Sequence, residues 1–485
     1  MLDFPNLLPY TSVMRGQKVE KGGGRSPNWT QKSEEREASN YHHDVKIDMD
    51  PCVLESMTER MRRGPKLLKK TAGGSSCCIF RIPHSLAEIN PKAYRPQIVS
   101  IGPYHHGKTK ELQMIEEHKW RFLNEFLDRT QSSTGTGLDE YMKEMMKLVP
   151  QARDCYSEEI PLSDTEFAKV LLLDGCFVVG LLRKYGEVEE FEDEDPIFLV
   201  PWVIPFLMRD LLKLENQIPF FVLKRLFEVS ENPDGKKGGI ASYSLVRLAL
   251  EFFNAGMTRP AEVLDGFSDN FDSKHLLDLF RSSFLTGKTR EPEQDNPSAK
   301  LINSVSKLRA AGIGFQVLPE AESFLEIKFR NGVLGIPKLT IDDFSGAFLQ
   351  NCVAFEQSHQ HCSMYMTTYA TFMDCLIDTG KDVSLLRDDK IIDNYFGTDE
   401  EVASLFNDMG KDVAFDVESC YLAEQLERVN GYYWNNWHVY WATFRNSYFS
   451  SPWSIISVMA ASLLLCLTFV QTFFEVYDCC ESNHP

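Results

Sequence analysis

The chain has 485 residues, of which 43% are hydrophobic and 25% are charged, and its 51 Lys and Arg against 70 Asp and Glu give a net charge of −19. This composition excludes collagen-like and wholly disordered chains. The acidic balance argues against a nucleic-acid partner, which would need clustered cations. The mean hydropathy of −0.26 excludes a polytopic membrane protein but not a single span.

The N-terminal part of the chain is predicted to be a polar, disordered tail over residues 1–76, because it offers little apolar surface to offset the entropy of ordering. Residues 1–10 lack the positively charged start of a secretory signal. The tail carries one N-glycosylation sequon, Asn28-Trp29-Thr30. The 12 cysteines are irregularly spaced and form no C-x-x-C motif, so we expect reduced thiols.

A mainly α domain is predicted over residues 77–450, because apolar residues recur there mostly at helical spacing. A short extended segment over 98–101 precedes an amphipathic helix over about 112–127. A second helix is expected over 138–156, bent at Pro150.

The centre of the domain is predicted to be strongly apolar. Ser163 and Glu166 form a capping box that opens a helix ending before Gly186, and this helix is apolar on most sides. Residues 201–229 are also apolar, but their charges and prolines exclude a membrane span. We expect two buried helices there, divided near 216–219.

Three polar segments are predicted to be surface loops, namely the acidic residues 187–195 and residues 230–240 and 286–298. A helix is expected to begin at Pro297 and to end at Gly312.

A small antiparallel β insertion is predicted over about 313–344. Residues 324–330 alternate with a period of two, and Asn331-Gly332 is a hairpin signal. A third strand over 338–341 would complete a meander.

Helices are expected to resume at Ala347. Thr398 and Glu401 form a second capping box, whose helix is closed by Gly410. No internal repeat of about 20–50 residues occurs, which argues against a solenoid fold.

The C-terminal region is predicted to hold a transmembrane helix over 453–475, followed by a short tail over 476–485. Residues 454–474 read SIISVMAASLLLCLTFVQTFF, and as a helix they would span about 30 Å, the thickness of a bilayer core. The alternative is a buried core helix. Upstream aromatic residues between 433 and 448 recur every three or four positions, as at a membrane interface. The residues assigned to the anchor are Trp453, Ile455, Ile456, Leu463, Leu464, Leu465, Phe469 and Phe473.

The flanking charges predict the orientation of this helix. Arg445 precedes the apolar residues 454–474, and Glu475, Asp478 and Glu481 follow them, so we expect the large domain in the cytosol. The membrane is expected to be the plasma membrane. For Cys479 and Cys480, free thiols are favoured over palmitoylation.

A phosphate-loop pattern occurs at residues 102–109, which read GPYHHGKT and follow an extended segment. We reject this interpretation, because Pro103 lacks a backbone donor and the next three residues are bulky where a phosphate must approach. Asp174, in the position of a magnesium-binding acid, is expected within a capped helix rather than after a strand. The chain also lacks the βαβ alternation of a parallel sheet.

No catalytic, cofactor-binding or metal-binding residue is assigned from the sequence. Asp174 and Glu215 are the best candidates for buried acids, and we favour structural carboxylates that fix helix packing. The histidine-containing groups lack the spacing of a structural zinc site, so no metal is predicted. These groups are His42-His43, His105-His106, and His359, His361 and Cys362.

Several long motifs resemble one family, the plant domain of unknown function 247. The resemblance covers about residues 77–475, including the apolar C-terminal segment. The motifs are residues 79–83 (IFRIP), 90–97 (NPKAYRPQ), 99–107 (VSIGPYHHG), 116–120 (EEHKW), 173–177 (LDGCF), 214–220 (LENQIPF), 332–334 (GVL) with 336–337 (IP), and 354–357 (AFEQ).

This resemblance implies a membrane-associated land-plant protein without an established enzymatic activity. Some family members are implicated in self-incompatibility in grasses, which suggests recognition or signalling. The family-motif residues without an assigned role are Gly102, Pro103, Tyr104, His105, His106, Gly107, Asp174, Gly175, Glu215, Asn216, Gln217 and Pro219.

Two functions follow as hypotheses. The first is a membrane-anchored, non-enzymatic recognition or signalling protein, whose lipid partner is the bilayer and whose protein partner meets loop surfaces such as 187–195 and 230–240. The second is an enzyme, with nucleotide as one candidate substrate, that has a pocket around Gly102–Lys108, Asp174 and Glu215. Convergence of these groups on one open pocket would favour the enzyme.

Overall fold

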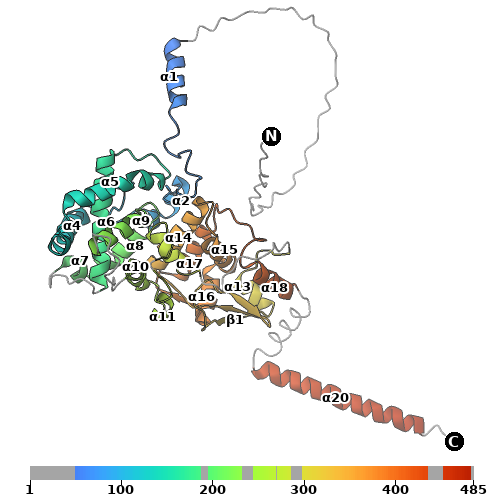
Figure 1. Ribbon diagram of the computed structural model, residues 1–485. Helices are drawn as coiled ribbons and strands as arrows, with labels where there is room; N and C mark the ends of the chain where they lie inside the picture. The colour runs from blue at the N-terminus through green and yellow to red at the C-terminus, as the bar shows by residue number, and fades with distance from the viewer. Residues whose placement is uncertain are drawn as a thin grey trace, which may run out of the picture. The chain divides into compact units, whose positions relative to one another are not determined.

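The computed structural model describes residues 50–186, 195–231, 244–268, 270–285, 298–434 and 452–481. The chain divides into two units, residues 1–62 and 63–485 (Figure 1). In the first unit the structure describes helix α1, Pro51–Arg62, in which every side chain is exposed. The disorder predicted for residues 1–49 lies outside the described residues.

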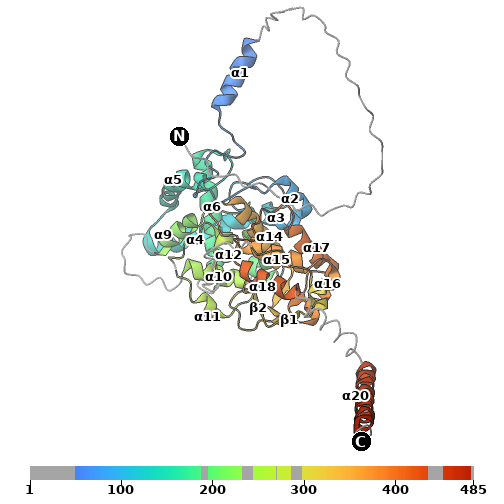
Figure 2. The ribbon, with the colours of Figure 1, turned by 90° about the vertical axis from the view of Figure 1, so that its right-hand side faces the viewer.

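The second unit is mainly helical, as predicted. Its core is built around helix α6, Asp164–Tyr185, which packs against α4, α5, α9 and α10 (Figures 1 and 2). The side chain of Ser163 accepts a hydrogen bond from the backbone N–H of Glu166, which confirms the predicted capping box. Nearly all of α6 from Phe167 onward is buried, because its residues are apolar on most faces.

The predicted division of the apolar stretch 201–229 into two helices is confirmed. Helix α8 ends at Leu211, helix α9 begins at Phe220, and both bury apolar residues in the core. The helices of this half are α2 (His84–Ile89), α3 (Pro91–Tyr94), α4 (Gln113–Thr134), α5 (Leu138–Asp154), α7 (Pro196–Leu199), α8 (Val203–Leu211), α9 (Phe220–Glu231), α10 (Leu245–Asn254), α11 (Ala261–Leu264) and α12 (Leu276–Ser282).

A second group of helices packs around α14, which contacts α3, α8, α12, α15 and α17. Figure 2 shows α14 between the α4–α6 side of the domain and the α15–α17 side. The predicted capping box at Thr398 and Glu401 is confirmed at the start of α17. The helices of this half are α13 (Val305–Ala310), α14 (Asp343–Ser358), α15 (Tyr365–Leu376), α16 (Gly380–Asp388), α17 (Asp399–Met409) and α18 (Ala423–Tyr433).

The β insertion contains the predicted hairpin, but it is not an antiparallel meander. Strand β2, Lys328–Arg330, pairs antiparallel with β3, Val333–Ile336, around the Asn331-Gly332 turn. Strand β1, Gly314–Val317, pairs with β3 in parallel. Sequence alternation indicates a strand but does not identify its neighbour, which explains the difference.

The predicted third strand of the meander belongs to a second sheet. Strand β4, Leu339–Ile341, pairs in parallel with β5, Ile392–Asn394. Helices α14, α15 and α16 lie between these two strands in the chain, as a parallel connection requires.

Two predicted boundaries differ from the structure. Residues 298–304 are not helical, and α13 begins only at Val305. In this segment the carbonyl of Lys300 accepts a hydrogen bond from the Asn430 side chain at 2.7 Å, so the segment packs against α18. Packing also begins before Cys77, because the backbone N–H of Lys69 donates to the carbonyl of Ser157 at 2.8 Å.

Helix α20, Pro452–Glu481, contains the apolar C-terminal segment. Its window Ile456–Phe473 has a mean hydropathy of 2.0 and no buried residue, so it is long and apolar enough to cross a membrane. The alternative prediction of a buried core helix is therefore not supported. Most of the upstream aromatic stripe lies outside the described residues.

Candidate functional site

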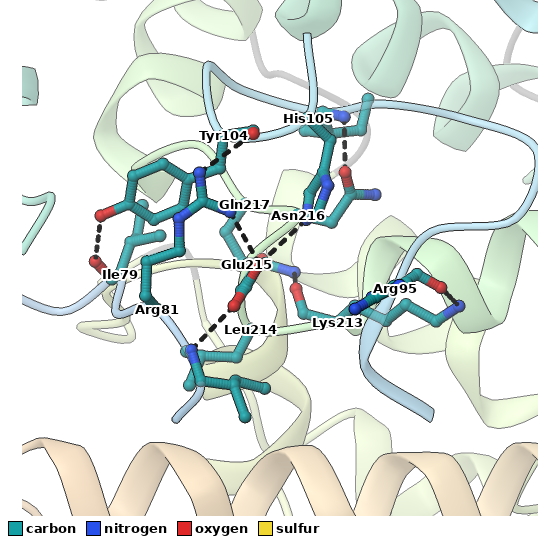
Figure 3. Close-up of polar contacts among 12 residues, drawn as sticks. Ile79, Arg81, Arg95, Tyr104, His105, Lys213, Leu214, Glu215, Asn216 and Gln217 are labelled. Carbon is teal, nitrogen blue, oxygen red and sulfur yellow. Dashed lines mark hydrogen bonds and ion pairs between the residues drawn. The ribbon is translucent and has the colours of Figure 1, made fainter. Parts of the chain in front are cut away.

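Several of the family motifs converge on residues 95–107, which comprise the segment 95–101 and the Gly102–Gly107 loop and lie between α3 and α4. Acidic side chains from α6 and α8 accept hydrogen bonds from the backbone of this segment. So does the amide of Asn216, in the turn between α8 and α9, which Figure 3 shows. An extended segment inside a helical core has no strand partner for its N–H groups, so side chains must accept their hydrogen bonds. We call this set of contacts the motif network.

Asp174 on α6 joins this segment to a buried lysine. Its Oδ2 accepts a hydrogen bond from the backbone N–H of Gly102 at 2.7 Å, and its Oδ1 lies 2.6 Å from Lys119 Nζ. Lys119 also donates to the carbonyl of Ser100 and to Glu116 Oε1. Both charges of the Asp174–Lys119 pair are buried, and each is neutralised by the other.

Asp210 on α8 performs the same task three residues earlier in the segment. Its Oδ2 accepts hydrogen bonds from the N–H groups of Gln97, Ile98 and Val99 at 2.7–3.1 Å. Its Oδ1 lies 2.8 Å from Lys213 Nζ, which also donates to the carbonyl of Arg95. Burial lowers the pKa of Lys213, and the charge of Asp210 opposes this effect.

Glu215 lies between the segment that contains Arg81 and Ile82 and the Gly102–Gly107 loop. Its Oε1 accepts from the N–H of Ile82 at 2.8 Å, and its Oε2 lies 2.8 Å from Arg81 Nη1 and 3.1 Å from His105 Nε2 (Figure 3). Burial raises the pKa of Glu215, but contact with His105, the Ile82 N–H and the charge of Arg81 outweigh it, and the net pKa is lowered. Glu215 is therefore held as a carboxylate.

The two amides after Glu215 fix the same segment. Asn216 Oδ1 accepts from the N–H of Ile101 at 2.7 Å, and its Nδ2 donates to the carbonyls of Val99 and Asp210. Gln217 Nε2 donates to the carbonyls of Leu211 and Lys213, which caps the end of α8. Pro219 immediately precedes α9, where a missing N–H costs nothing.

The Gly102–Gly107 loop packs closely at its start against the turn between α8 and α9. Gly102 has φ = +75°, and a Cβ on it would lie 2.4 Å from the carbonyl oxygen of Gln217. The Tyr104 ring is buried and stacks on Arg81, whose Cζ lies 4.0 Å from the ring centroid. Burial raises the pKa of Tyr104 to about 12.

The outer part of the loop is open to solvent. Pro103 is half-buried, whereas His106, Gly107 and Lys108 are exposed. Asp174 lies inside a helix, as predicted, and its oxygens are engaged by Gly102 and Lys119. The phosphate-loop interpretation therefore has no structural basis.

Gly175 has a packing role next to Asp174. A Cβ at this position would lie 2.3 Å from Cδ1 of Leu226, so its absence allows α6 to approach α9 closely.

The motif network contains both predicted acids, Asp174 and Glu215, and a third, Asp210, that was not predicted. Asp174, Asp210 and Glu215 each pair with a cation and accept backbone N–H groups, so none is poised to take a proton from a substrate. Surface hollows occur elsewhere, one beside Arg387 and Tyr395 and another beside Glu144 and Arg225. The contacts of these three acids are those of structural carboxylates.

A second buried network lies on α12 and α14, and sequence reasoning did not identify it. Glu356 Oε1 accepts from Arg281 Nε at 2.7 Å and from the N–H of Met366, and its Oε2 accepts from the N–H of Thr367. These N–H groups belong to the first turn of α15, so Glu356 caps that helix. Its position in the AFEQ motif was the only signal in the sequence.

The histidine groups form no metal site in the part of the chain that the structure describes, where no three metal-ligating side chains cluster. The rings of His359 and His361 lie 6.0 Å apart between centroids, and burial lowers the pKa of His359. His42 and His43 lie outside the described residues.

The predicted anchor residues lie on α20, and those whose side chains are described are exposed. The side chains of Ile455, Cys479 and Cys480 lie outside the described side chains. The exposed anchor residues are Trp453, Ile456, Leu463, Leu464, Leu465, Phe469 and Phe473.

Comparison with known proteins gives a consistent family match. Residues 79–467 match the family DUF247, described as a plant protein of unknown function. The chain is 38% identical over 431 residues to the UPF0481 protein At3g47200 of Arabidopsis thaliana, covering 84% of this chain and 88% of that protein. It is 23% identical over 489 residues to a second Arabidopsis thaliana UPF0481 protein, At3g02645, covering 82% and 90% of the two chains. No solved structure matches the chain.

Proposed function

Because the chain belongs to the plant protein family of unknown function DUF247, we propose that it is a membrane-anchored recognition protein that acts by binding a protein partner. The observation that carries this proposal is helix α20, whose apolar window Ile456–Phe473 has no residue buried inside the protein. An exposed apolar helix of this length is stable in water only if something covers it, and a bilayer core has the matching thickness.

The motif network supports binding over catalysis. Its acids accept hydrogen bonds from backbone N–H groups and pair with buried cations. The motif residues in this network therefore position residues 95–107. We therefore assign partner recognition to surface residues. The loops that we propose for this role, residues 187–195 and 230–240, lie almost entirely outside the described residues.

Membrane anchoring is tested by fractionation of cells that express tagged versions of the chain. Truncation before Ser451 removes α20 and should move the protein from an alkali-resistant membrane pellet to the soluble fraction. Truncation after Glu481 keeps α20 and is the matched control, which should remain in the pellet. Alkali-resistant pelleting of the first truncation would contradict a sole C-terminal anchor.

We propose that the large domain faces the cytosol and that the membrane is the plasma membrane. The natural sequon Asn28-Trp29-Thr30 reports the side, because glycosylation occurs only in the lumen of the secretory pathway. Asn28 should remain unglycosylated, whereas a sequon tag added after Pro485 should be glycosylated. The reverse pattern, lost in Asn28→Gln, would overturn the proposed orientation.

Partner binding is tested by crosslinking in intact membranes. The full chain should capture a defined set of proteins, and the same set should be captured when α20 is replaced by an unrelated single span. Replacing Glu189 and Glu190 by Ser tests the acidic loop and should reduce capture. If the exchanged anchor captures nothing specific, recognition does not reside in the helical domain and the proposal fails.

A further inference from the structure

Residues 60–70, at the end of α1 and just after it, concentrate positive charge. Six of these eleven residues are Lys or Arg, and no Asp or Glu occurs between Glu59 and Glu88. The chain as a whole carries a net charge of −19. Because exposed charges act over only about 8–10 Å at physiological salt, an anion that approaches this run responds to its local positive charge and not to the net charge of the chain.

Two adjacent leucines within this run are displayed to solvent. Leu67 is 79% exposed and Leu68 is 63% exposed. A single exposed apolar residue is common on protein surfaces, but these two are neighbours and have lysines on both sides. Residues 66–70, KLLKK, therefore combine an apolar tip with a cationic rim, and we call them the basic tip.

The backbone on both sides of the leucines is fixed to the helical domain. The N–H of Lys69 donates to the carbonyl of Ser157 at 2.8 Å, and the carbonyl of Lys66 accepts from the N–H of Glu159 at 2.8 Å. Lys69 Nζ also donates to the carbonyl of Arg153 at 2.7 Å. These contacts attach the basic tip to the chain that follows α5, while both leucine side chains stay outside the core.

The lysines of the basic tip present their charge at the surface. Lys66 and Lys70 are exposed, and Lys69 contacts a carbonyl, which has no net charge. Lys66 Nζ lies 3.2 Å from Glu159 Oε2, but both side chains of this pair are more than half exposed. An exposed pair of this kind contributes little stability, so Lys66 can exchange Glu159 for another anion at little cost.

We propose that the basic tip docks on the surface of an anionic bilayer, where Leu67 and Leu68 enter the boundary between headgroups and acyl chains and the lysines contact lipid phosphates and carboxylates. This inference rests on the proposed function, in which α20 anchors the chain and the domain faces the cytosol. The cytoplasmic leaflet carries the anionic lipids, so its charge complements the basic tip.

The chemistry of the basic tip selects a bilayer over a nucleic acid. Binding to nucleic acid phosphates requires cations alone, whereas paired leucines within a cationic rim fit a surface that is anionic outside and apolar beneath. A few cations and two leucines bind a bilayer only weakly by themselves. Covalent attachment to a membrane anchor raises the effective concentration of the basic tip at the bilayer, so weak docking is sufficient.

The test uses the full chain reconstituted into vesicles that contain a lipid-bound quencher. An environment-sensitive fluorescent amino acid replaces Gly64, which is exposed and where a Cβ would meet nothing within 4 Å. The vesicles consist of phosphatidylcholine alone or of phosphatidylcholine with about 30% phosphatidylserine. The same fluorescent amino acid in place of Thr109, an exposed residue outside the basic tip, is the matched control.

The probe at Gly64 should be quenched on vesicles with phosphatidylserine and little on phosphatidylcholine alone, whereas the probe at Thr109 should respond to neither. Raising the salt concentration from about 0.1 M to about 1 M shortens the Debye length from about 10 Å to about 3 Å and should reverse the quenching. Leu67→Ser combined with Leu68→Ser should lower the docking equilibrium constant about 10-fold or more, because the apolar contribution is lost.

Lys66→Gln combined with Lys70→Gln should lower the same constant roughly 5-fold for each lysine, or about 30-fold for both. Both side chains are exposed, so the fold should be unaffected. Lys92→Gln combined with Lys108→Gln is the matched control, because it removes the same charge from exposed positions outside the basic tip and should change the constant little.

Quenching that does not depend on phosphatidylserine, or that both lysine double variants reduce equally, would overturn the basic tip as the docking site. A probe at Gly64 that is unquenched on both kinds of vesicle would overturn the lipid as the occupant. A photocrosslinker at Gly64 in native membranes that joins the chain to an acidic protein instead of to lipid would have the same meaning.

Insertion of α20 is measured separately on the same vesicles by flotation in alkaline carbonate. A chain that floats there without quenching at Gly64 refutes the docking alone. A chain that floats only at neutral pH and only with phosphatidylserine retains the docking and refutes the proposed anchor. A chain that floats under neither condition refutes both.

Discussion

At the residue scale, the buried charges of the motif network stabilise the fold only as pairs. Lys119 and the Asp174 side chain are almost fully inaccessible, and Lys119 Nζ lies 2.6 Å from Asp174 Oδ1. Removing one partner leaves the other charge buried without compensation, which costs more than the pair itself contributes. Such residues can be essential for stability without touching any ligand.

Asp174→Ala should therefore destabilise the domain by about 3–5 kcal/mol, because Lys119 loses its counter-charge and the Gly102 N–H loses its acceptor. The measurement is chemical unfolding of the detergent-solubilised full chain, followed by tryptophan fluorescence. Asp139→Ala is the control, since it breaks an exposed pair with Lys143 and should leave the midpoint unchanged. Equal midpoints for the two variants would contradict a structural role for Asp174.

His275 makes stability depend on pH in a predictable direction. It is fully buried, its Nε2 lies 3.1 Å from the carbonyl oxygen of Cys78, and its Nδ1 accepts from the N–H of Asp278. Burial is the main cause that lowers its pKa to about 4. The neutral His275 ring therefore caps the start of α12.

Because the folded pKa of His275 lies below the unfolded value of about 6.5, the unfolded chain takes up the proton first as pH falls. The contribution of this group is fully present above pH 6.5, and roughly 3 kcal/mol should be lost between pH 6.5 and about 4. Unfolding free energies measured across this range check the slope. His275→Asn keeps an acceptor for Asp278 but does not titrate, so a slope as steep as that of the natural chain would show that another group is responsible.

At the element scale, the two glycines of the Gly102–Gly107 loop allow the cost of backbone strain to be compared with the cost of a steric clash. Both glycines have positive φ, +75° and +68°. A Cβ on Gly102 would meet the carbonyl oxygen of Gln217 at 2.4 Å, whereas a Cβ on Gly107 would meet nothing within 4 Å. The two positions share their conformation and differ in their surroundings.

Gly107→Ala should cost only the strain of a left-handed residue, about 1–2 kcal/mol. Gly102→Ala carries the same strain plus a clash with backbone, and should be destabilising by several kcal/mol or prevent folding. Thermal unfolding of the two variants measures the difference. Lys108→Ala on the exposed side should change neither stability nor partner capture, and equal costs at both glycines would mean that the loop does not pack on the turn at Gln217.

Local patterns predicted elements well and their partners poorly. The capping boxes at Ser163 and Thr398 gave both helix starts, because the two reciprocal hydrogen bonds lie within four residues. The parallel partner of β3 was missed, since the pairing of β1 with β3 is set by tertiary packing. The role of Asp174 as a structural acid was predicted, but Lys119, 55 residues away, was not identified as its partner.

At the scale of the whole molecule, the charged residues behind the net charge of −19 all lie outside the apolar window Ile456–Phe473 of α20. The average composition conceals this division, because an 18-residue apolar window changes the mean hydropathy of 485 residues very little. Burial of apolar side chains stabilises the packed helical domain. For the apolar helix, its length determines whether it can span a bilayer.

The first unit, residues 1–62, should be dispensable for the stability of the second. Each residue of α1 is exposed, including Leu54, Met57 and Met61, so α1 itself contributes no buried side chain. A chain that begins at Arg63 should unfold at the same denaturant concentration as the full chain. A chain that begins at Thr71 also loses the Lys69 N–H bond to the carbonyl of Ser157 and the Lys69 Nζ contact with the carbonyl of Arg153, and it should be measurably less stable. If the shorter deletion already lowers the midpoint, residues before Arg63 contribute to the packed domain, and the boundary between the two units lies nearer the N-terminus.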